Sequence, residues 1–269
     1  MMHMDEHEKV LIFDLVGKFA HFRKFYTNSS SLSYHLPPRT TLEGIIAAMM
    51  GLDRDSYYDL FLPSKSLIAV SPRTRTRGIM QTINYLSVKN AGDLSGRDRR
   101  TQVPFEIVVS ENANEDLRYR VYFHHRDLDM VRRVEERIRR AIFHYPISLG
   151  PANFLCQVDF VAWGDMSEFI DTRNANDSVN VFSPIPIDAM RHFDILSGRE
   201  VQHKFVRDTF PFHFGDQRTP GRNVKLIYSK DFSPVEITTP FGSRLIRYSD
   251  HGFPVTEGIV FSEDWIPDN

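Results

Sequence analysis

The sequence predicts an α+β fold that begins with a split βαβ unit, in the order β-α-β-β-α-β, and ends in a β-rich region. Three observations support this prediction. Residues 10–16 form an apolar run of strand length, two later segments carry apolar residues at helical spacing, and the part after residue 170 alternates short apolar runs with Pro and Gly. A chain of 269 residues is long enough to bury a proper core.

The first strand, Val10 to Val16, is apolar on both faces, which predicts a central position in its sheet. After the polar turn and Pro37-Pro38, a helix is expected to start with Thr40 as N-cap. Glu43 stands three residues later and completes a capping box, and Gly51 ends the helix.

The next predicted strand is Leu67 to Val70, followed by a long polar and basic excursion. Val103 to Ser110 and Arg118 to Phe123 are then expected to pair as a hairpin. A second helix, Leu128 to Phe143, has the apolar stripe Leu128, Val131, Val134, Ile138 and Ile142, and its outer face pairs Glu135 with Arg139 and Glu136 with Arg140. A last core strand is predicted at Phe154 to Trp163.

The Asn- and Asp-rich connection from Asp171 to Asn180 is the best candidate for a boundary. We therefore predict a first domain at residues 1–170, with an insertion at about 72–102, and a β-rich C-terminal region at 171–269. The strands expected in that region are Val179 to Ile187, Glu200 to Phe210, Val224 to Tyr228 and Val235 to Thr239.

Composition indicates an ordinary globular protein, with 41% hydrophobic and 25% charged residues. The single cysteine, Cys156, excludes an internal disulfide and favours a cytoplasmic location, and no apolar run approaches a membrane span. The net charge of −2 hides a segregation: residues 73–100 hold seven basic and two acidic side chains, whereas residues 157–200 hold eight acidic and three basic ones. The basic region can bind a polyanion while the acidic region contacts protein partners.

The first candidate site is the segment Gly17 to Gly51, in which basic residues alternate with aromatic ones and no carboxylate occurs between Asp14 and Glu43. Basic groups neutralise phosphates and aromatic faces stack on bases, so this composition suits single-stranded RNA. The alternative is that Phe19, Phe22 and Phe25 are core residues.

The excursion from Pro72 to Gln102 is the second candidate site. In an extended strand, Arg73, Arg75 and Arg77 point to one side at a spacing of about 6.5 to 7 Å, close to the phosphate spacing of a stretched single strand. The tip, Lys89 to Gly96, is polar and contains glycine, which is typical of a mobile finger; a surface loop with incidental arginines is the alternative.

The first segment, GKFAHFRKFYTNSSSLSYHLPPRTTLEGIIAAMMG, resembles the amino-terminal signature of the fifth CRISPR-associated (Cas) protein family. RTQVPFE at 100–106, YRVYF at 119–123 and YPISLG at 145–150 are also similar to that family. The resemblance implies a ferredoxin-like (RRM-like) core of the repeat-associated RNA-binding (RAMP) superfamily. It also implies a type I effector complex, Cascade, in antiviral defence, with the type I-B branch as the nearest match.

The resemblance further implies a subunit that holds the 5′ handle of the guide RNA (crRNA), contacts the backbone and large subunits of Cascade, and meets target DNA through the complex. The palm surface is then expected to comprise Lys18, His21, Arg23, Lys24, Tyr34, Arg39 and Thr40, and the inserted thumb to contribute Arg73, Arg75, Arg77, Lys89, Arg97, Arg99 and Arg100.

The alternative function is a metal-independent endoribonuclease that processes CRISPR repeat RNA, since one branch of that family cuts RNA. His21, Lys24 and Tyr26, or His124-His125, could supply a general base, but no Lys-His pair matches the position expected of that branch. The sequence offers no metal-ligand spacing and no phosphate-cradling glycine loop, so we expect no cofactor and no catalysis.

Overall fold

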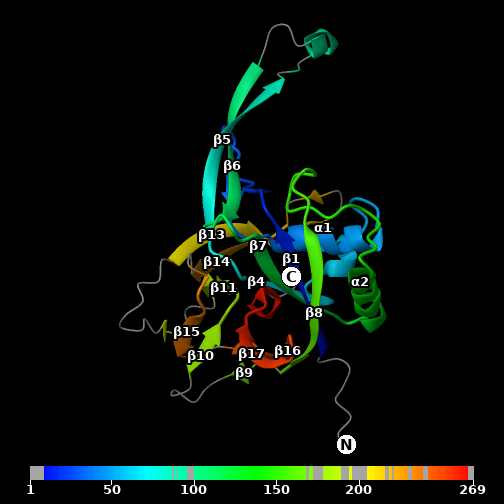
Figure 1. Cartoon of the computed structure of the whole chain (residues 1–269), viewed down its shortest axis with the longest axis vertical. Coiled ribbons are helices and arrows are strands. Elements are labelled where there is room, and N and C mark those ends of the chain that lie inside the picture. The colour runs from blue at the N-terminus through cyan, green and yellow to red at the C-terminus, as the bar shows by residue number, and fades with distance from the viewer. Residues whose placement is uncertain are drawn as a thin grey trace, which may run out of the picture.

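The computed structural model describes residues 9–86, 88, 90–95, 100–167, 170–171, 178–188, 194–195, 205–215, 218–219, 221–229, 232–238 and 242–265. Strands dominate this part of the chain, and the longer helices are α1 (Arg39–Met50) and α2 (Leu128–Arg140). The predicted α+β class is confirmed. Figure 1 shows both helices on the same side of a curled sheet, from which a narrow ribbon of two strands projects.

β1 (Lys9–Gly17) lies in the middle of the sheet, paired with β7 (Leu117–His125) on one side and β8 (Gln157–Met166) on the other. β4 (Ser66–Pro72) pairs with the far edge of β7, which gives the antiparallel order β8-β1-β7-β4. The predicted central position of the first strand is confirmed. One face of β1 packs Leu11, Phe13 and Leu15 in a core shared with both helices, and the other face buries Val10 and Ile12 in a second cluster.

The C-terminal strands continue this sheet past β8. In the described residues the order runs β12-β15-β10-β17-β16-β8, and β9 pairs with β16. Their bounds are β9 Ile170–Asp171, β10 Ser178–Val181, β12 Asp194–Ile195, β15 Val235–Thr238, β16 Gly242–Asp250 and β17 Phe253–Ile259. A second sheet has the order β11-β14-β13, with β11 Ile185–Pro186, β13 Phe205–Pro211 and β14 Asn223–Ser229. The β16–β17 hairpin was not predicted, because its residues lack strict alternation.

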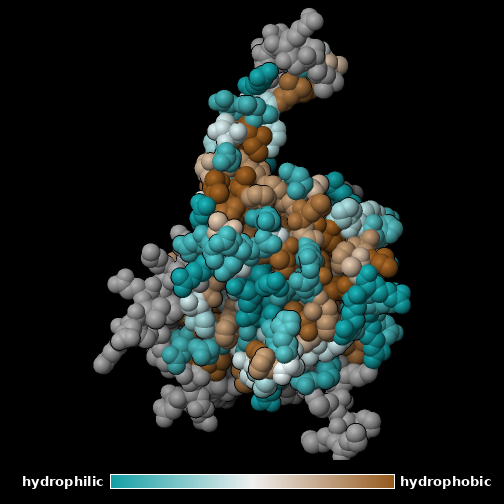
Figure 2. Space-filling view, in the orientation of Figure 1, coloured by the Kyte–Doolittle hydropathy of each residue, from teal (hydrophilic) through white to brown (hydrophobic). Residues whose placement is uncertain are grey.

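The ribbon consists of β5 (Thr76–Leu86) and β6 (Arg100–Ser110), which pair antiparallel from Thr76 opposite Ser110 to Leu86 opposite Arg100. The predicted hairpin between 103–110 and 118–123 is therefore wrong. β6 pairs with β5, whereas β7 is bordered by β1 and β4. The two flanks of the excursion are both extended and form a longer ladder with each other. Figure 2 shows hydrophobic side chains along the ribbon and around its base.

Both helices differ from their predictions at an end. Pro38 precedes the first helical residue of α1, so the Thr40 capping box does not form; Gly51 ends the helix with a φ of 76°, as predicted. Asp127 caps α2 by accepting backbone hydrogen bonds, and Ala141, in a left-handed conformation, ends it at Arg140. Ile142 consequently lies outside the helix and is 60% exposed, so its predicted inward position is wrong.

The remaining short elements are β2 (Phe22–Arg23), β3 (Ser33–Tyr34), and the 3-10 helices η2 (Tyr58–Phe61), η3 (Ala91–Ser95) and η6 (Ser262–Trp265). The outer ion pairs of α2 are formed as predicted, with 2.8 Å between Glu135 and Arg139 and 3.0 Å between Glu136 and Arg140. Among the described residues, no helix combines the length and apolar content needed to cross a membrane.

Candidate nucleic-acid interface

The segment from Gly17 to Tyr34 packs beside the base of the ribbon. The backbone of Ala20 exchanges hydrogen bonds with Val108 of β6, and Ser31 donates its N–H to the carbonyl of Pro104. The residues next to this pairing are buried, and those on either side of them are exposed. Lys18, Phe19 and Arg23 are exposed, whereas Ala20, His21 and Phe22 are buried. An exposed basic and aromatic surface therefore adjoins the ribbon.

The aromatic residues of this segment divide between the surface and the core. Phe19, Phe25 and Tyr26 are 47%, 51% and 49% exposed, and Phe22 is 3% exposed. The Phe19 ring lies 5.7 Å from that of Phe154, centroid to centroid. The interpretation of Phe22 as a core residue is confirmed, while Phe19 and Phe25 retain faces on which a base could stack.

His21 is held inside the protein. Its Nδ1 lies 2.7 Å from the Glu106 carbonyl, its Nε2 lies 2.9 Å from the Ser31 hydroxyl, and its ring stacks on Phe105 at 3.9 Å. Burial lowers the pKa of His21, against the raising effect of Glu106. His21 thus joins the segment to β6 as a neutral ring.

Gly150 fixes the neighbouring loop against this histidine. The Leu149 carbonyl accepts a hydrogen bond from the His21 N–H at 2.9 Å, and Gly150 has a φ of 106°. A Cβ at Gly150 would lie 1.9 Å from the His21 carbonyl oxygen, so only glycine fits. Gly150 is the last residue of the YPISLG segment (145–150) on which the family resemblance partly rests.

Lys24 and Tyr26 both bind Asp208 of β13, each at 2.6 Å. Burial alone would lower the pKa of Lys24, but the hydrogen bond and charge of Asp208 raise it. Lys24 is therefore a cation whose charge is matched by a nearly buried carboxylate. Sequence alone gave no signal for this partner, because 184 positions separate the two residues.

Tyr34 belongs to the core. Its side chain has no solvent exposure, its ring stacks on Phe210 with centroids 4.4 Å apart, and its hydroxyl donates to the Thr209 carbonyl. Burial raises the pKa of the Tyr34 hydroxyl. The ring faces that a base would use are already covered.

Arg39 is also buried, at 8% exposure. Its guanidinium pairs with Glu43 one turn along α1 and with Glu263 of η6 at 2.5 Å, and donates to the Phe61 carbonyl at 2.8 Å. Two buried carboxylates, Glu43 and Glu263, therefore neutralise the charge of Arg39.

Thr40 lines a groove of about 540 Å³ between α1 and the Pro146–Gly150 loop. Arg23 and Phe25 also line this groove, and so does Arg218, which was not selected from the sequence.

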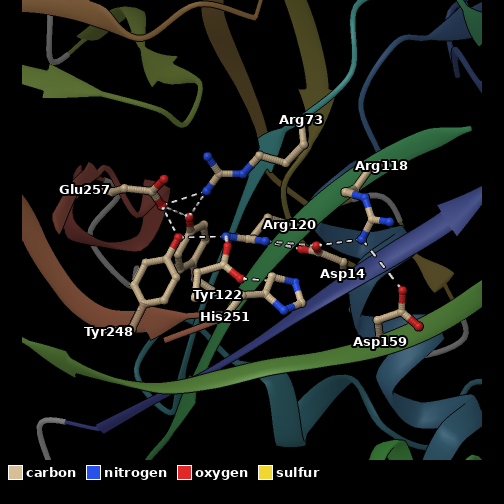
Figure 3. Close-up of polar contacts among 10 residues, drawn as sticks. Asp14, Arg73, Arg118, Arg120, Tyr122, Asp159, Tyr248, His251 and Glu257 are labelled. Atoms are coloured by element: carbon tan, nitrogen blue, oxygen red, sulfur yellow. Dashed lines mark hydrogen bonds and ion pairs between the residues drawn. The ribbon is translucent and has the colours of Figure 1, made fainter. Parts of the chain in front are cut away.

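At the root of the ribbon, the predicted alternation is present but the three arginines are not equivalent. Thr74 and Thr76 are buried, and Arg75 and Arg77 are exposed. Arg73 instead turns to the C-terminal hairpin and donates to Glu257 and the Tyr122 hydroxyl, both at 2.6 Å (Figure 3). Arg100, at the start of β6, is exposed. Lys89, Arg97 and Arg99 lie outside the described residues.

The histidine pair considered for catalysis is bonded to the backbone. His124 Nδ1 lies 2.8 Å from the Lys9 carbonyl, and His125 Nε2 lies 2.9 Å from the Leu60 carbonyl. Asp14, which precedes the basic segment, is buried and binds Arg118 and Arg120. Within the described ranges, no three His, Cys, Asp or Glu side chains gather as a metal site.

The family model described as CRISPR-associated protein (Cas_Cas5) matches residues 10–144, which span half of the chain and include most of this surface. The chain belongs to the Cas5 family of CRISPR-associated proteins. This confirms the family that the first segment and the 100–123 region indicated. No curated protein matches the chain.

Solved structures are similar to the chain as a whole. A CRISPR protein from Archaeoglobus fulgidus is 12% identical with a TM-score of 0.50, covering 93% of this chain and 99% of that one. A chain of a CRISPR RNA-guided surveillance complex is 16% identical with a TM-score of 0.44, over 85% and 91% of the two chains. A Cas protein is 12% identical with a TM-score of 0.40, over 84% and 98%. The A. fulgidus protein shares the fold.

Proposed function

We propose that this chain is a non-catalytic subunit of a type I CRISPR effector complex that binds the 5′ handle of the crRNA. Membership of the Cas5 family supports a role beside crRNA. The observation that carries the proposal is the exposed surface at the base of the ribbon, where Lys18, Arg23 and Phe25 lie on the segment that packs along β6. Cations for phosphates and aromatic faces for bases occur together there.

We also propose a fold type, a role for the ribbon and a set of partners. The strand order β8-β1-β7-β4, with α1 and α2 packed on one face, is what we expect of a ferredoxin-like core of the RAMP type. The projecting β5–β6 ribbon fits the thumb. The proposed protein partners are the backbone and large subunits of Cascade, and the chain meets target DNA through the complex. We also propose that the complex belongs to the type I-B branch and that the protein is cytoplasmic.

The environment of the candidate general bases favours binding over cleavage. A catalytic histidine needs a ring nitrogen directed at the ribose 2′-hydroxyl. Both ring nitrogens of His21 have protein partners, and Lys24 and Tyr26 share Asp208. The metal-independent endoribonuclease is therefore the weaker alternative.

Incubating the purified protein with labelled CRISPR repeat RNA in EDTA separates the two functions. We expect a stable complex with uncut RNA, measured by fluorescence anisotropy and by denaturing gel. Site-specific cleavage that disappears in His21→Ala or His124→Ala would establish the nuclease instead. An RNA of the same length and scrambled sequence is the control for handle recognition.

A further inference from the structure

The groove beside α1 continues the proposed RNA surface. It lies between α1 and the Pro146–Gly150 loop, and its volume of about 540 Å³ is within the range of about 300–1,000 Å³ that small-molecule sites have. Arg23 and Phe25 line the groove and are also exposed on the segment that packs along β6. An RNA strand bound to that segment is therefore adjacent to the groove.

Aromatic side chains form part of the groove walls. Phe25 is 51% exposed, and Tyr57 and Phe214 are half-buried. The rings of Tyr57 and Phe214 both pack against the buried Tyr58, with 5.1 and 6.1 Å between ring centroids. This packing holds the two rings in place, and aromatic faces held in place are what a nucleobase stacks on.

The charges of the groove suit a phosphate. Arg23 and Arg218 are exposed, and among the described residues that line the groove no side chain is acidic. Arg218 Nε lies 3.9 Å from a carboxylate oxygen of Asp55, which also pairs with Arg54 at 3.4 Å. A long ion pair at the surface is weak, so the guanidinium of Arg218 keeps donors for a phosphate.

The first turn of α1 adds to this preference. Thr40 and Thr41 line the groove, the turn contains no acidic residue, and no side chain caps it. The carboxylate of Glu43, further along the helix, is buried against Arg39. The positive end of the helix dipole therefore also favours an anion in the groove.

Gly44 keeps the groove open. It stands inside α1, where glycine is unfavourable for the helix. A Cβ at this position would lie 3.2 Å from the Tyr57 hydroxyl and, apart from its own helix, would have no other described atom within 4 Å. Because Gly44 lines the groove, a larger side chain there would take up space inside it.

We propose that this groove is a subsite for one unpaired nucleotide of the bound RNA, with its base against the aromatic walls and its phosphate at Arg218. The inference rests on the proposed function, because the nucleotide belongs to the RNA that the base of the ribbon binds. It deepens that function by assigning Tyr57, Phe214 and Arg218, none of which was selected from the sequence, to RNA recognition. An acidic peptide is the other ligand that two arginines could bind, but it would not continue an RNA surface.

The test uses labelled CRISPR repeat RNA and a set of the same RNA in which one nucleotide at a time is abasic. Fluorescence anisotropy measures the affinity of each RNA for the wild type, Arg218→Ala and Gly44→Leu. The matched control is Arg54→Ala, because Arg54 is an exposed arginine that pairs with the same carboxylate but does not line the groove. Melting temperatures identify any variant that does not fold, and Phe25→Ala replaces Gly44→Leu if that variant fails.

We expect one abasic position to weaken binding to the wild type about tenfold and to have no effect on Gly44→Leu, whose groove is filled. Arg218→Ala should lower the slope of log affinity against log salt by about 0.7, because one phosphate contact is lost. Arg54→Ala should leave that slope unchanged.

Two outcomes overturn the subsite and leave the proposed function standing. One is wild-type RNA affinity and salt slope in both groove variants, which would leave the groove to an acidic protein segment. The other is a loss of affinity that is the same in Gly44→Leu and the wild type at every abasic position. A wild-type chain that does not bind the unmodified RNA would overturn the proposed function as well.

Discussion

Two groups of basic side chains differ in whether a carboxylate pairs with them. One group lies in the Gly17–Gly51 segment and the other at the root of the ribbon. In the segment, Lys24 and Arg39 meet carboxylates from the C-terminal half, Asp208 and Glu263. At the ribbon, Arg75 and Arg77 face solvent. The exception is Arg73, which Glu257 binds. A cation is available to RNA only where the distant part of the chain supplies no acid, so the acidic second half neutralises part of the basic first half.

The largest effect is expected for Arg39→Ala. Removing this guanidinium leaves Glu43 and Glu263 buried without their cation, and burial already raises the pKa of Glu263 despite Arg39. Breaking such a buried pair costs about 3–5 kcal/mol. Thermal unfolding should therefore show a large drop in melting temperature, with RNA affinity falling along with the folded fraction.

Arg23→Ala is the matched control from the same segment, because Arg23 is exposed and, among the described residues, its guanidinium donates at 3.4 Å to the Thr27 carbonyl and pairs with no carboxylate. Its stability should change by about 0.5 kcal/mol or less. Equal melting temperatures for Arg39→Ala and the wild type would contradict the claim that Arg39 stabilises the fold as the partner of buried carboxylates.

A second test contrasts the aromatic rings of the same segment. Tyr34→Ala opens a cavity beside Phe210 and should cost about 3 kcal/mol of unfolding free energy. Phe25→Ala should leave stability near wild type and weaken RNA binding by about 1–3 kcal/mol, since its half-exposed ring is free to stack. The reverse outcome, a stable Tyr34→Ala with weak RNA binding, would return Tyr34 to the interface.

The ribbon root gives a third test. Replacing Arg75 and Arg77 together with Ala should lower the slope of log affinity against log salt by about 1.4, because each single-strand phosphate contact releases about 0.7 of a counterion. Arg73→Ala should leave that slope unchanged and reduce stability, since Glu257 and Tyr122 lose their partner. An unchanged slope in the double variant would exclude a phosphate clamp at this position.

Local patterns in the sequence were sufficient for some of the fold and for few of the site contacts. The central strand, the end of α1 at Gly51 and the surface ion pairs of α2 follow from periodicity and neighbouring residues. The pairing of β6 with β5 was missed because strand pattern alone does not choose between two possible neighbours. The carboxylates of Asp208, Glu263 and Glu257, which bind Lys24, Arg39 and Arg73, were missed because each lies more than 180 residues from its partner.

The smallest expected effect concerns His21 and its pH dependence. Burial lowers the folded-state pKa of His21 below its ordinary value of 6.5, so the unfolded chain binds a proton on this ring more readily than the folded chain does. The contribution of the neutral ring to the free energy of unfolding is complete above pH 6.5 and decreases as the pH falls toward the lowered folded-state pKa.

The variant His21→Gln has no ring to titrate. The difference in unfolding free energy between wild type and His21→Gln, measured by urea denaturation, should therefore be constant well above pH 6.5 and shift in favour of the variant as the pH falls below 6.5. A difference that stays flat would mean that folding does not shift the pKa of His21, and one that grows in favour of the wild type as the pH falls would mean that the ring is protonated in the folded state. In that case His21 would carry a charge beside the RNA surface, like Arg75 and Arg77 and unlike the buried residues of its own segment.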